Sequence, residues 1–547
     1  MEEDQTTNLP KVGKVIDDLD LGELRLKAQQ WRHDSHYWKS QFERAKKREH
    51  KKDERIKKLE AEVRLLKQKL FGKKSESKQK SKKKSTPPSD SNDEGEDILP
   101  DKKGRGSQPG SPGHGRRKNE DLERVNELHD LPDDKKNCAE CGLAYKHKGL
   151  TRTTEIVEVF VKAHVRKLQF PQYHKTCDCS QTPNIISAPP PPRLIPGNGY
   201  GVSVWTELLL SKFCFHQPLS RTLASLEAHK FELPVGTVTD GFRRIQPLFD
   251  PIIESIRETS LQDVHWHADE TRWSVFVSIE DKIGHRWYLW VYRSETCIYY
   301  QLEPSRATSV PESFFPKDIE GILSVDRYSA YKCLIKSREG LTLAFCWAHV
   351  RRDFIDACKK WPELGDWMLS WLLEIRELYR LNDFRLAEEE NTEKWHEADI
   401  EVRLQIDNMK EKATAELAVS SPHSETKKVL TSLLNHWEGL TVFIDHPHVP
   451  LDNNPAENAI RGPVVGRKNY YGSGSEWSAK LASSLFSIFA TLKLHKVNPY
   501  EWLSSYLNAC AEAGGKSPDD ISAFTPWAKP PLASEESPPD SLVSGFP

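Results

Sequence analysis

Residues 264–279 read VHWHADETRWSVFVSI, and residues 321–326 read GILSVD. Apolar and polar residues alternate in the first stretch, which predicts strands over 264–269 and 273–279, and the second stretch is an apolar strand that ends on a carboxylate. Further strands are predicted over 287–301 and 341–346, the last one after a helix. Three consecutive strands followed by alternating helices and strands are typical of an RNase H-like α/β fold, in which acidic residues from different strands meet at one edge of the sheet.

Three acidic residues are candidates for this edge. Asp269 and Asp326 each lie where an apolar strand gives way to polar residues, so their carboxylates are expected to meet and to bind Mg²⁺ or Mn²⁺, which prefer oxygen ligands. The third acid is Glu457 in LDNNPAENAIR, residues 451–461, at a predicted helix start. A capping box with Asn454 as the N-cap would explain Glu457 without catalysis. Each acid alone is more often structural, and the combination of the three predicts a catalytic site.

The size and composition of the chain exclude several classes of protein. Its 547 residues far exceed a typical domain, so several folding units are expected. Hydrophobic residues make up 37% and charged residues 29%, and the longest apolar runs are too short to span a bilayer. The first residues, MEEDQTTNLPKVGK, show no signal or transit peptide, so a cytoplasmic location is expected. The 10 cysteines are too few for a disulfide scaffold, and closely spaced ones indicate metal binding instead.

The N-terminal region, residues 1–74, combines basic charge with an apolar seam. Residues 41–84 carry 19 Lys and Arg against 7 Asp and Glu, which favours a polyanionic partner, although a solvated helix face has the same composition. Steps of three and four residues predict a short coiled coil, and hence a homo-oligomer, through Ile56, Leu59, Val63, Leu66 and Leu70. A single amphipathic helix docked on its own protein is the alternative. Residues 75–119 contain almost no apolar side chains and are predicted to be a disordered basic linker.

Residues 120–186 contain two cysteine pairs, Cys138 with Cys141 and Cys177 with Cys179. Four thiolates suit tetrahedral Zn²⁺, so a structural zinc-binding module is predicted. The second pair is spaced more tightly than is usual in such modules, and unliganded buried cysteines are the alternative.

A proline-rich linker over residues 187–197 precedes a region, 198–260, that is predicted to be helical. Its two helices, over 219–229 and 238–245, would suit a helix-turn-helix DNA reader in which Arg243 and Arg244 contact phosphates. Ordinary helix packing explains the same pattern equally well.

Motifs along the chain resemble those of the DDE transposases of insertion-sequence family sixty-six. In the predicted catalytic core these motifs are HADETRW, GILSVDRYSAY, CWAHVRRDF and LDNNPAENAIRGPVVGRKNYYGSGS. KLFGKKSE, PGHGRR, the four-cysteine module and IPGNGYGVSVWTELLLSKFCFHQPLSR are similar to the same family in the same order, so the resemblance covers about residues 35–510. The shortened second cysteine pair departs from the family, and the tail over 516–547, predicted to be disordered, has no counterpart in it.

The resemblance implies an RNase H-like catalytic core over residues 261–350 and 451–475, in which Asp269, Asp326 and Glu457 are the metal-binding triad. It also implies a helical insertion over 351–450, which separates the third acid from the second in sequence, and the chain continues with helices over 476–515.

Five further residues are assigned to the neighbourhood of the triad. Cys346 and His349 in CWAH are similar to an auxiliary active-site motif of several DDE families, and a buried cysteine with a helix-capping histidine is the alternative reading. Shortly after Glu457, the residues placed to hold the DNA backbone are Arg461, Arg467 and Lys468, although exposed basic residues are common on helices.

The predicted function is that of a bacterial transposase that binds the ends of its insertion sequence and cleaves and joins double-stranded DNA. Two Mg²⁺ or Mn²⁺ ions at the three acids would activate a hydroxyl and stabilise the leaving 3′-oxygen. The expected partners are element ends, target DNA and further copies of the chain, and the sequence leaves open whether accessory proteins of the element are needed. The alternatives are a DNA-binding protein with an inactive catalytic domain, which the presence of all three acids argues against, and an RNase H-like nuclease that cuts without joining.

Overall fold

The computed structural model describes residues 183–278, 285–419 and 423–528 throughout, and shorter stretches before them. These are residues 39–63 without 41, 45, 58 and 62, and residues 130–132, 136, 140–141, 143–146, 157, 162–176 and 181. The chain divides into two compact units, residues 1–72 with 162–547 and residues 73–161, and all the labelled helices and strands belong to the first. The predicted zinc ligands Cys138, Cys177 and Cys179 lie outside the described residues, as do Leu66, Leu70 and the tail after residue 528.

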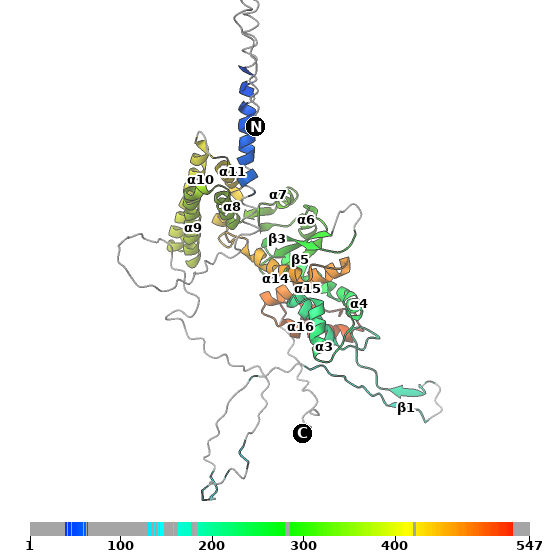
Figure 1. Cartoon of the computed structure of the whole chain (residues 1–547). Helices are drawn as coiled ribbons and strands as arrows, with labels where there is room; N and C mark the ends of the chain where they lie inside the picture. The colour runs from blue at the N-terminus through cyan, green and yellow to red at the C-terminus, as the bar shows by residue number, and fades with distance from the viewer. Residues whose placement is uncertain are drawn as a thin grey trace, which may run out of the picture. The chain divides into compact units, whose positions relative to one another are not determined.

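A five-stranded mixed sheet organises the first unit (Figure 1). Its strand order is β5-β4-β3-β6-β7, where the strands are β3 (His265–Ser274), β4 (Arg286–Arg293), β5 (Ile298–Glu303), β6 (Gly321–Val325) and β7 (Leu341–Phe345). β3, β4 and β5 are antiparallel, and β6 and β7 run parallel to β3. The predicted mixed α/β class is therefore confirmed.

The strand boundaries differ from those predicted. The predicted strands over 264–269 and 273–279 form one strand, β3, because residues 267–274 pair without interruption with β4 and keep the polar segment Glu270–Arg272 in the ladder. The predicted strand over 287–301 is two strands, since a turn closed by the bond from the Ser294 N–H to the Cys297 carbonyl (2.9 Å) separates β4 from β5. Asp269 consequently lies within a strand and not at its end.

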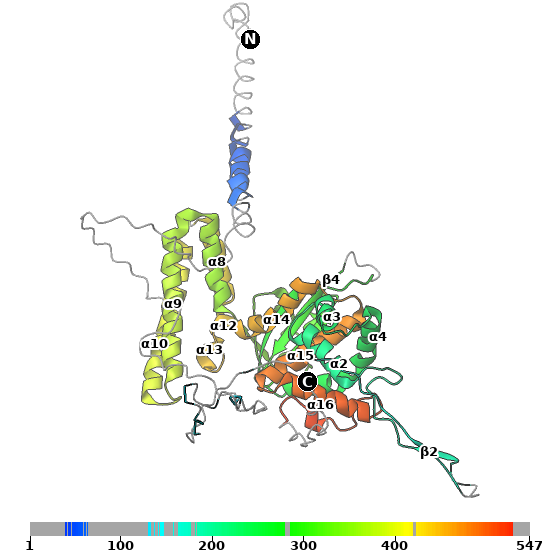
Figure 2. The ribbon, with the colours of Figure 1, turned by 60° about the horizontal axis from the view of Figure 1, so that its bottom comes forward.

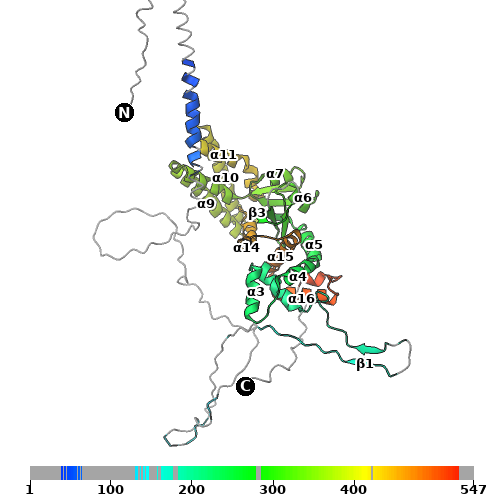
Figure 3. The same ribbon diagram turned by 45° about the vertical axis from the view of Figure 1, so that its right-hand side comes forward.

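Helices cover both faces of the sheet, as Figures 1 and 3 show. One face, which carries Trp273, Leu289 and Val291, packs against α15 (Glu476–Leu494) and the helices α5 (Asp250–Ser260) and α16 (Pro499–Glu512). The other face, with Trp266, Trp290 and Tyr292, packs against α6 (Ser309–Phe314) and α7 (Ser329–Leu334). Alternation of side chains along each strand divides the two sets, so the sheet is buried on both sides.

α15 also covers the outer edge of the sheet. The backbone N–H groups of Ile298 and Tyr300 in β5 donate to the hydroxyls of Thr491 (3.1 Å) and Ser487 (2.8 Å) on this helix. Side chains of α15 thus satisfy backbone donors that an edge strand would otherwise present to solvent.

Between residue 198 and α5 lie the α-helices α2 (Val202–Leu209), α3 (Leu219–Ala228) and α4 (Val235–Ile245). The last two coincide with the helices predicted over 219–229 and 238–245. Gly241 of α4 lies against the indole of Trp205, where an added Cβ would come within 2.0 Å of the ring, so the two helices pack more closely than any larger residue would allow. Both belong to the core cluster that also contains the sheet, and a role in reading DNA stays a prediction.

Six helices occupy the sequence between β7 and α14 (Asn454–Tyr470): α8 (Trp347–Lys360), α9 (Gly365–Ala387), α10 (Glu393–Ala418), α11 (Ser424–Asn435), α12 (Trp437–Leu440) and α13 (Val442–Asp445). They share a core of their own around Trp347, Phe354 and Trp371. Figure 2 shows α9 and α10 as a pair of long antiparallel helices.

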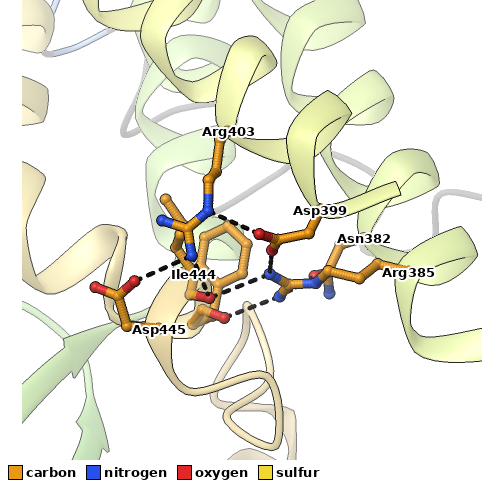
Figure 4. Close-up of polar contacts among 7 residues, drawn as sticks. Asn382, Arg385, Asp399, Arg403, Ile444 and Asp445 are labelled. Atoms are coloured by element: carbon orange, nitrogen blue, oxygen red, sulfur yellow. Dashed lines mark hydrogen bonds and ion pairs between the residues drawn. The ribbon is translucent and has the colours of Figure 1, made fainter. Parts of the chain in front are cut away.

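A buried ionic network joins this helical pair to α13 (Figure 4). The side chain of Arg385, which is 0% exposed, donates to Asp399 (2.7 Å), to Asn382 (2.8 Å) and to the carbonyls of Phe443 (2.8 Å) and Ile444 (3.2 Å). Asp399 also accepts a bond from Arg403 (2.7 Å), which reaches Asp445 as well (3.2 Å). One arginine therefore satisfies the free carbonyls of a short helix and neutralises a carboxylate between two long ones.

In the part of the chain that the structure describes, no helix combines the length and the apolar character that crossing a membrane requires.

Candidate active site

The parallel ladder between β3 and β6 brings the two aspartates together. His265 lies opposite Ile322 and His267 opposite Ser324. The ladder ends there, two residues before Asp269 in β3 and two residues before Asp326, which directly follows β6. The two carboxylates are near enough for the negative charge of Asp326 to act on Asp269. Residues two apart on a strand share a face, so both carboxylates lie on the face that also carries His267 and Ser324. The predicted meeting of these two acids agrees with this register.

The helix that carries Glu457 lies over the same face. Arg467 of α14 donates to the hydroxyl of Thr271 (3.0 Å) and to the carbonyl of Arg272, both in β3. Thr271 is two residues beyond Asp269 and therefore shares its face. The other end of α14, where Glu457 lies in the first turn, is tied to β3 by Asn453, which bonds the Ala268 carbonyl (2.8 Å) and accepts the Glu457 N–H (3.2 Å).

The start of α14 differs from the predicted capping box. The N-cap is Asn453, not Asn454, and its side chain makes no capping bond, so Glu457 is not at the position that closes such a box. The reason is that the Asn453 amide is bonded elsewhere, to the carbonyl of Ala268 (2.8 Å) and to Nδ1 of His267 (3.0 Å) in β3. The structural alternative for Glu457 is thereby removed, and its carboxylate is not used as a cap.

The three acids influence one another electrostatically. The pKa of Asp269 is raised to about 7, chiefly by burial and also by the negative charges of Glu270, Asp326 and Glu457, while the Glu270 N–H that bonds its carboxylate opposes the shift. Within the described ranges, no three His, Cys, Asp or Glu side chains are arranged as a ready-made metal cage. Buried carboxylates that destabilise one another's ionised form are nonetheless the donor set that a divalent cation favours.

His349 lies beside Glu457, whereas Cys346 contacts Asn453. Cys346, the N-cap of α8, is 3% exposed, and its Sγ accepts a bond from the Asn453 N–H (3.2 Å). His349 Nε2 lies 4.0 Å from Glu457 Oε1. Burial and the charge of Arg352 lower the pKa of His349, although Asp326 and Glu457 oppose the shift, so this imidazole is a neutral neighbour of the third acid at pH 7.

Comparison with known proteins supplies the family. Residues 198–481, more than half of the chain, match the family model described as "Transposase IS66 family", and the matched range contains Asp269, Asp326 and Glu457. The chain belongs to this transposase family.

Curated relatives of this IS66 family member extend the match. It is 25% identical to the uncharacterized protein y4jD of Sinorhizobium fredii over 416 residues, which cover 71% of the chain and 77% of y4jD. It is 25% identical to y4hP of the same organism over 419 residues, covering 72% of the chain and 73% of that relative. A further uncharacterized relative, y4qI, is 29% identical over 304 residues, 52% of the chain and 54% of its own length. No solved structure matches the chain.

Of the basic residues predicted to hold DNA in this IS66 family member, three lie on α14 and two on α4. Arg461 and Lys468 are exposed on α14 at helical spacing from Glu457. Arg467 is half-buried and bonded to β3, and burial lowers its pKa, so it anchors the helix. Arg243 and Arg244 are exposed on α4, and Arg244 forms an ion pair with Asp240 (2.9 Å).

Sequence reasoning missed an ionic cluster on the opposite face of β3. Glu270, whose side chain is 2% exposed, accepts bonds from Arg306 Nε (2.8 Å) and from the hydroxyl of Tyr331 (2.8 Å). The Arg306 guanidinium lies 3.8 Å from the centre of the Tyr328 ring, and the Tyr328 N–H bonds the Asp326 carboxylate (2.9 Å). The available signal was strand alternation, which directs Glu270 away from Asp269.

Proposed function

We propose that this IS66 family member is a DDE transposase that cleaves DNA at the ends of its element and joins the freed ends to target DNA. The observation that supports this function best is the parallel pairing of β3 with β6, which runs to two residues before Asp269 and Asp326, together with the negative charges of Asp326 and Glu457 that act on Asp269. We propose that these three residues hold two Mg²⁺ or Mn²⁺ ions, because a bound cation would relieve the repulsion that raises the pKa of Asp269.

The chemistry that such ions supply when bound is activation of the attacking hydroxyl and stabilisation of the leaving 3′-oxygen. The protein's own contribution is to position the three carboxylates. β3 and β6 fix the two aspartates in one register, the Tyr328 N–H orients the Asp326 carboxylate (2.9 Å), and α14 adds Glu457 from the other side of the site. Arg461 and Lys468 continue along α14, where exposed cations suit the phosphates of bound DNA.

The catalytic core proposed for these acids is RNase H-like. The supporting observation is the sheet itself, in which three antiparallel strands are followed by two strands parallel to the first, with the acids on the first strand, directly after the fourth strand and on a later helix. We further propose that the helices before this core, with Arg243 and Arg244, contribute to DNA binding, and that the protein acts in the cytoplasm.

The test of this function uses a DNA duplex taken from the flank of the reading frame, with Mg²⁺ as the only divalent cation. The wild-type chain is expected to nick the duplex at the element end and, when target DNA is added, to join the new 3′-hydroxyl to it. Binding without a nick would support the inactive DNA-binding alternative, and nicking without joining would support the nuclease alternative.

We propose that the N-terminal helix pairs two or more chains. The residues described between 39 and 63 are helical, and Ile56, Leu59 and Val63 of the seam are 52%, 45% and 48% exposed, which is unusual for an apolar stripe without a partner. Pairing of chains would bring both ends of an element into one complex.

Replacing Leu59 and Leu66 together by glutamate is expected to reduce the oligomer mass in light scattering and to abolish pairing of two element ends, because charges at seam positions repel across the interface. Cuts at single ends should persist in part. The matched control replaces Lys57 and Arg64 by glutamate. These residues follow the seam residues Ile56 and Val63 directly and lie outside the seam. An unchanged mass in the leucine variant would refute the coiled coil.

We also propose one structural Zn²⁺ held by Cys138, Cys141, Cys177 and Cys179. Elemental analysis of protein purified without chelator is expected to give one zinc per chain, and replacing Cys177 and Cys179 by serine should remove it, since thiolates are the ligands. The control replaces Cys333 and Cys358, free cysteines on α7 and α8, and should keep the metal. Zinc-free wild-type protein would exclude the module.

A further inference from the structure

Asn453 connects the strand that carries Asp269 and the helix that carries Glu457 to Cys346, the N-cap of α8. It is 2% exposed, and both its backbone groups and its side chain are bonded. Its N–H donates to Sγ of Cys346 (3.2 Å), at the end of β7, and its carbonyl accepts the N–H of Glu457 (3.2 Å). Its side chain bonds the carbonyl of Ala268 (2.8 Å), the residue before Asp269, and His267 Nδ1 (3.0 Å).

The orientation of the Asn453 amide follows from its partners. The Ala268 carbonyl can only accept, so the Nδ2 group of Asn453 faces it and the Oδ1 atom faces the imidazole of His267. Nδ1 of His267 must then carry a proton to complete the bond. A residue with two acceptors, or with no polar side chain, cannot reproduce both contacts.

The helix gives up a capping bond for these contacts. Asparagine is among the best N-cap residues because its side chain bonds the free N–H groups of the first turn. Asn453 occupies the N-cap of α14 without making that bond. The ladder between β3 and β6 stops at His267. The Asn453 side chain donates a hydrogen bond to the carbonyl of the next residue of β3, Ala268.

We infer that Asn453 is a positioning residue that sets the place of Glu457 relative to Asp269. The Asn453 side chain bonds the carbonyl of Ala268, one residue before Asp269, and the Asn453 carbonyl accepts the N–H of Glu457. A displacement of Asn453 would therefore move Glu457 with respect to Asp269. The inference rests on the proposed function, in which the two carboxylates act on the same phosphodiester.

The experiment compares Asn453→Ala and Asn453→Asp with Asn382→Ala in the full-length chain. Asn382 is the matched control, because it is also 2% exposed and its amide oxygen is also bonded, to Arg385 Nη2 (2.8 Å), but in the helical insertion. Asn453→Asp keeps the size of the side chain but replaces the donor by an oxygen and adds an ionisable carboxyl group, whereas Asn453→Ala removes the donor without adding charge. Three quantities are measured: the melting temperature, the Kd for element-end DNA, and kcat for cleavage with Mg²⁺ below the melting transition.

Both alanine variants are expected to lower the melting temperature to a similar extent. Only the two Asn453 variants should lower kcat, by about 10- to 100-fold, which is what a displacement of about 1 Å in a catalytic group costs. The Kd for DNA should stay within about twofold in all variants, since the exposed basic residues are untouched. A kcat for both Asn453 variants within twofold of that of Asn382→Ala would overturn the inference and leave the proposed function standing. A wild-type chain that does not cleave would overturn the proposed function and this inference with it.

Discussion

Replacing Asp326 by asparagine is expected to abolish cleavage of element-end DNA, with a loss of at least about 1,000-fold in kcat, while binding of the same DNA stays intact. The carboxylate is proposed to hold a metal ion whose stabilisation of the transition state is worth several kcal/mol, and about 1.4 kcal/mol corresponds to a factor of ten. Asp326 is not part of the hydrophobic cores, so the fold should survive. Asp269→Asn and Glu457→Gln are expected to behave alike, because the three acids act as one unit.

Thermal melting provides a readout of metal binding that is independent of activity. Mg²⁺ should raise the melting temperature of the wild-type chain and fail to do so in each acid variant, since a ligand stabilises only the form that binds it. Asp445→Asn, which alters a carboxylate 74% exposed in the helical insertion, is the control and should keep both cleavage and the shift. Metal-dependent cleavage by Glu457→Gln would contradict the triad and direct attention to Asp452 or Glu476 as the third ligand.

Replacing Arg385 by alanine is expected to destabilise the helical insertion by about 3–5 kcal/mol. The change leaves Asn382 and the carbonyls of Phe443 and Ile444 without their buried donor, and removes one of the two cations that neutralise Asp399. Hydrogen exchange reports local stability in a chain of several domains. The protected amides of α9 and α10 should exchange roughly 100- to 3,000-fold faster than in the wild type.

The control for this prediction is Arg403→Ala. Arg403 is 47% exposed and its partner Asp445 is 74% exposed, so screening by solvent should limit the loss to below about 1 kcal/mol. Asp399 keeps its bond to Arg385 in this variant. Equal exchange rates in the two variants would show that burial of Arg385 does not govern the stability of the network.

The parts of the fold that depend on short-range patterns could be predicted from the sequence. The strand that ends on Asp326 and the helices over 219–229 and 238–245 were predictable, because apolar periodicity marks them directly. The boundaries of β3 were not, since Glu270 and Arg272 stay in the strand only through pairing with β4, a contact between segments that the sequence pattern does not reveal.

The candidate site shows the same division. The sequence pattern predicted that Asp269 and Asp326 lie on neighbouring strands, because carboxylates at the ends of apolar strand patterns in one sheet tend to converge, but it did not reveal that Asp269 lies inside β3. Asn453 was missed in favour of Asn454, since either asparagine satisfies the local pattern of an N-cap and only the position of β3 decides which one faces it. The bond between Arg306 and Glu270 was equally invisible, because it joins a loop to a strand through side chains far apart in sequence.

The hydroxyls of Ser487 and Thr491 have a consequence for assembly. An uncovered edge strand is a template on which another polypeptide can add a strand, whether as a peptide ligand or as an aggregate. Because α15 occupies the N–H groups of Ile298 and Tyr300, the β5 side of the sheet offers no such template at these positions. If several copies gather on one piece of DNA, as proposed above, this edge is therefore closed to the strand addition that would fuse their sheets into a continuous one.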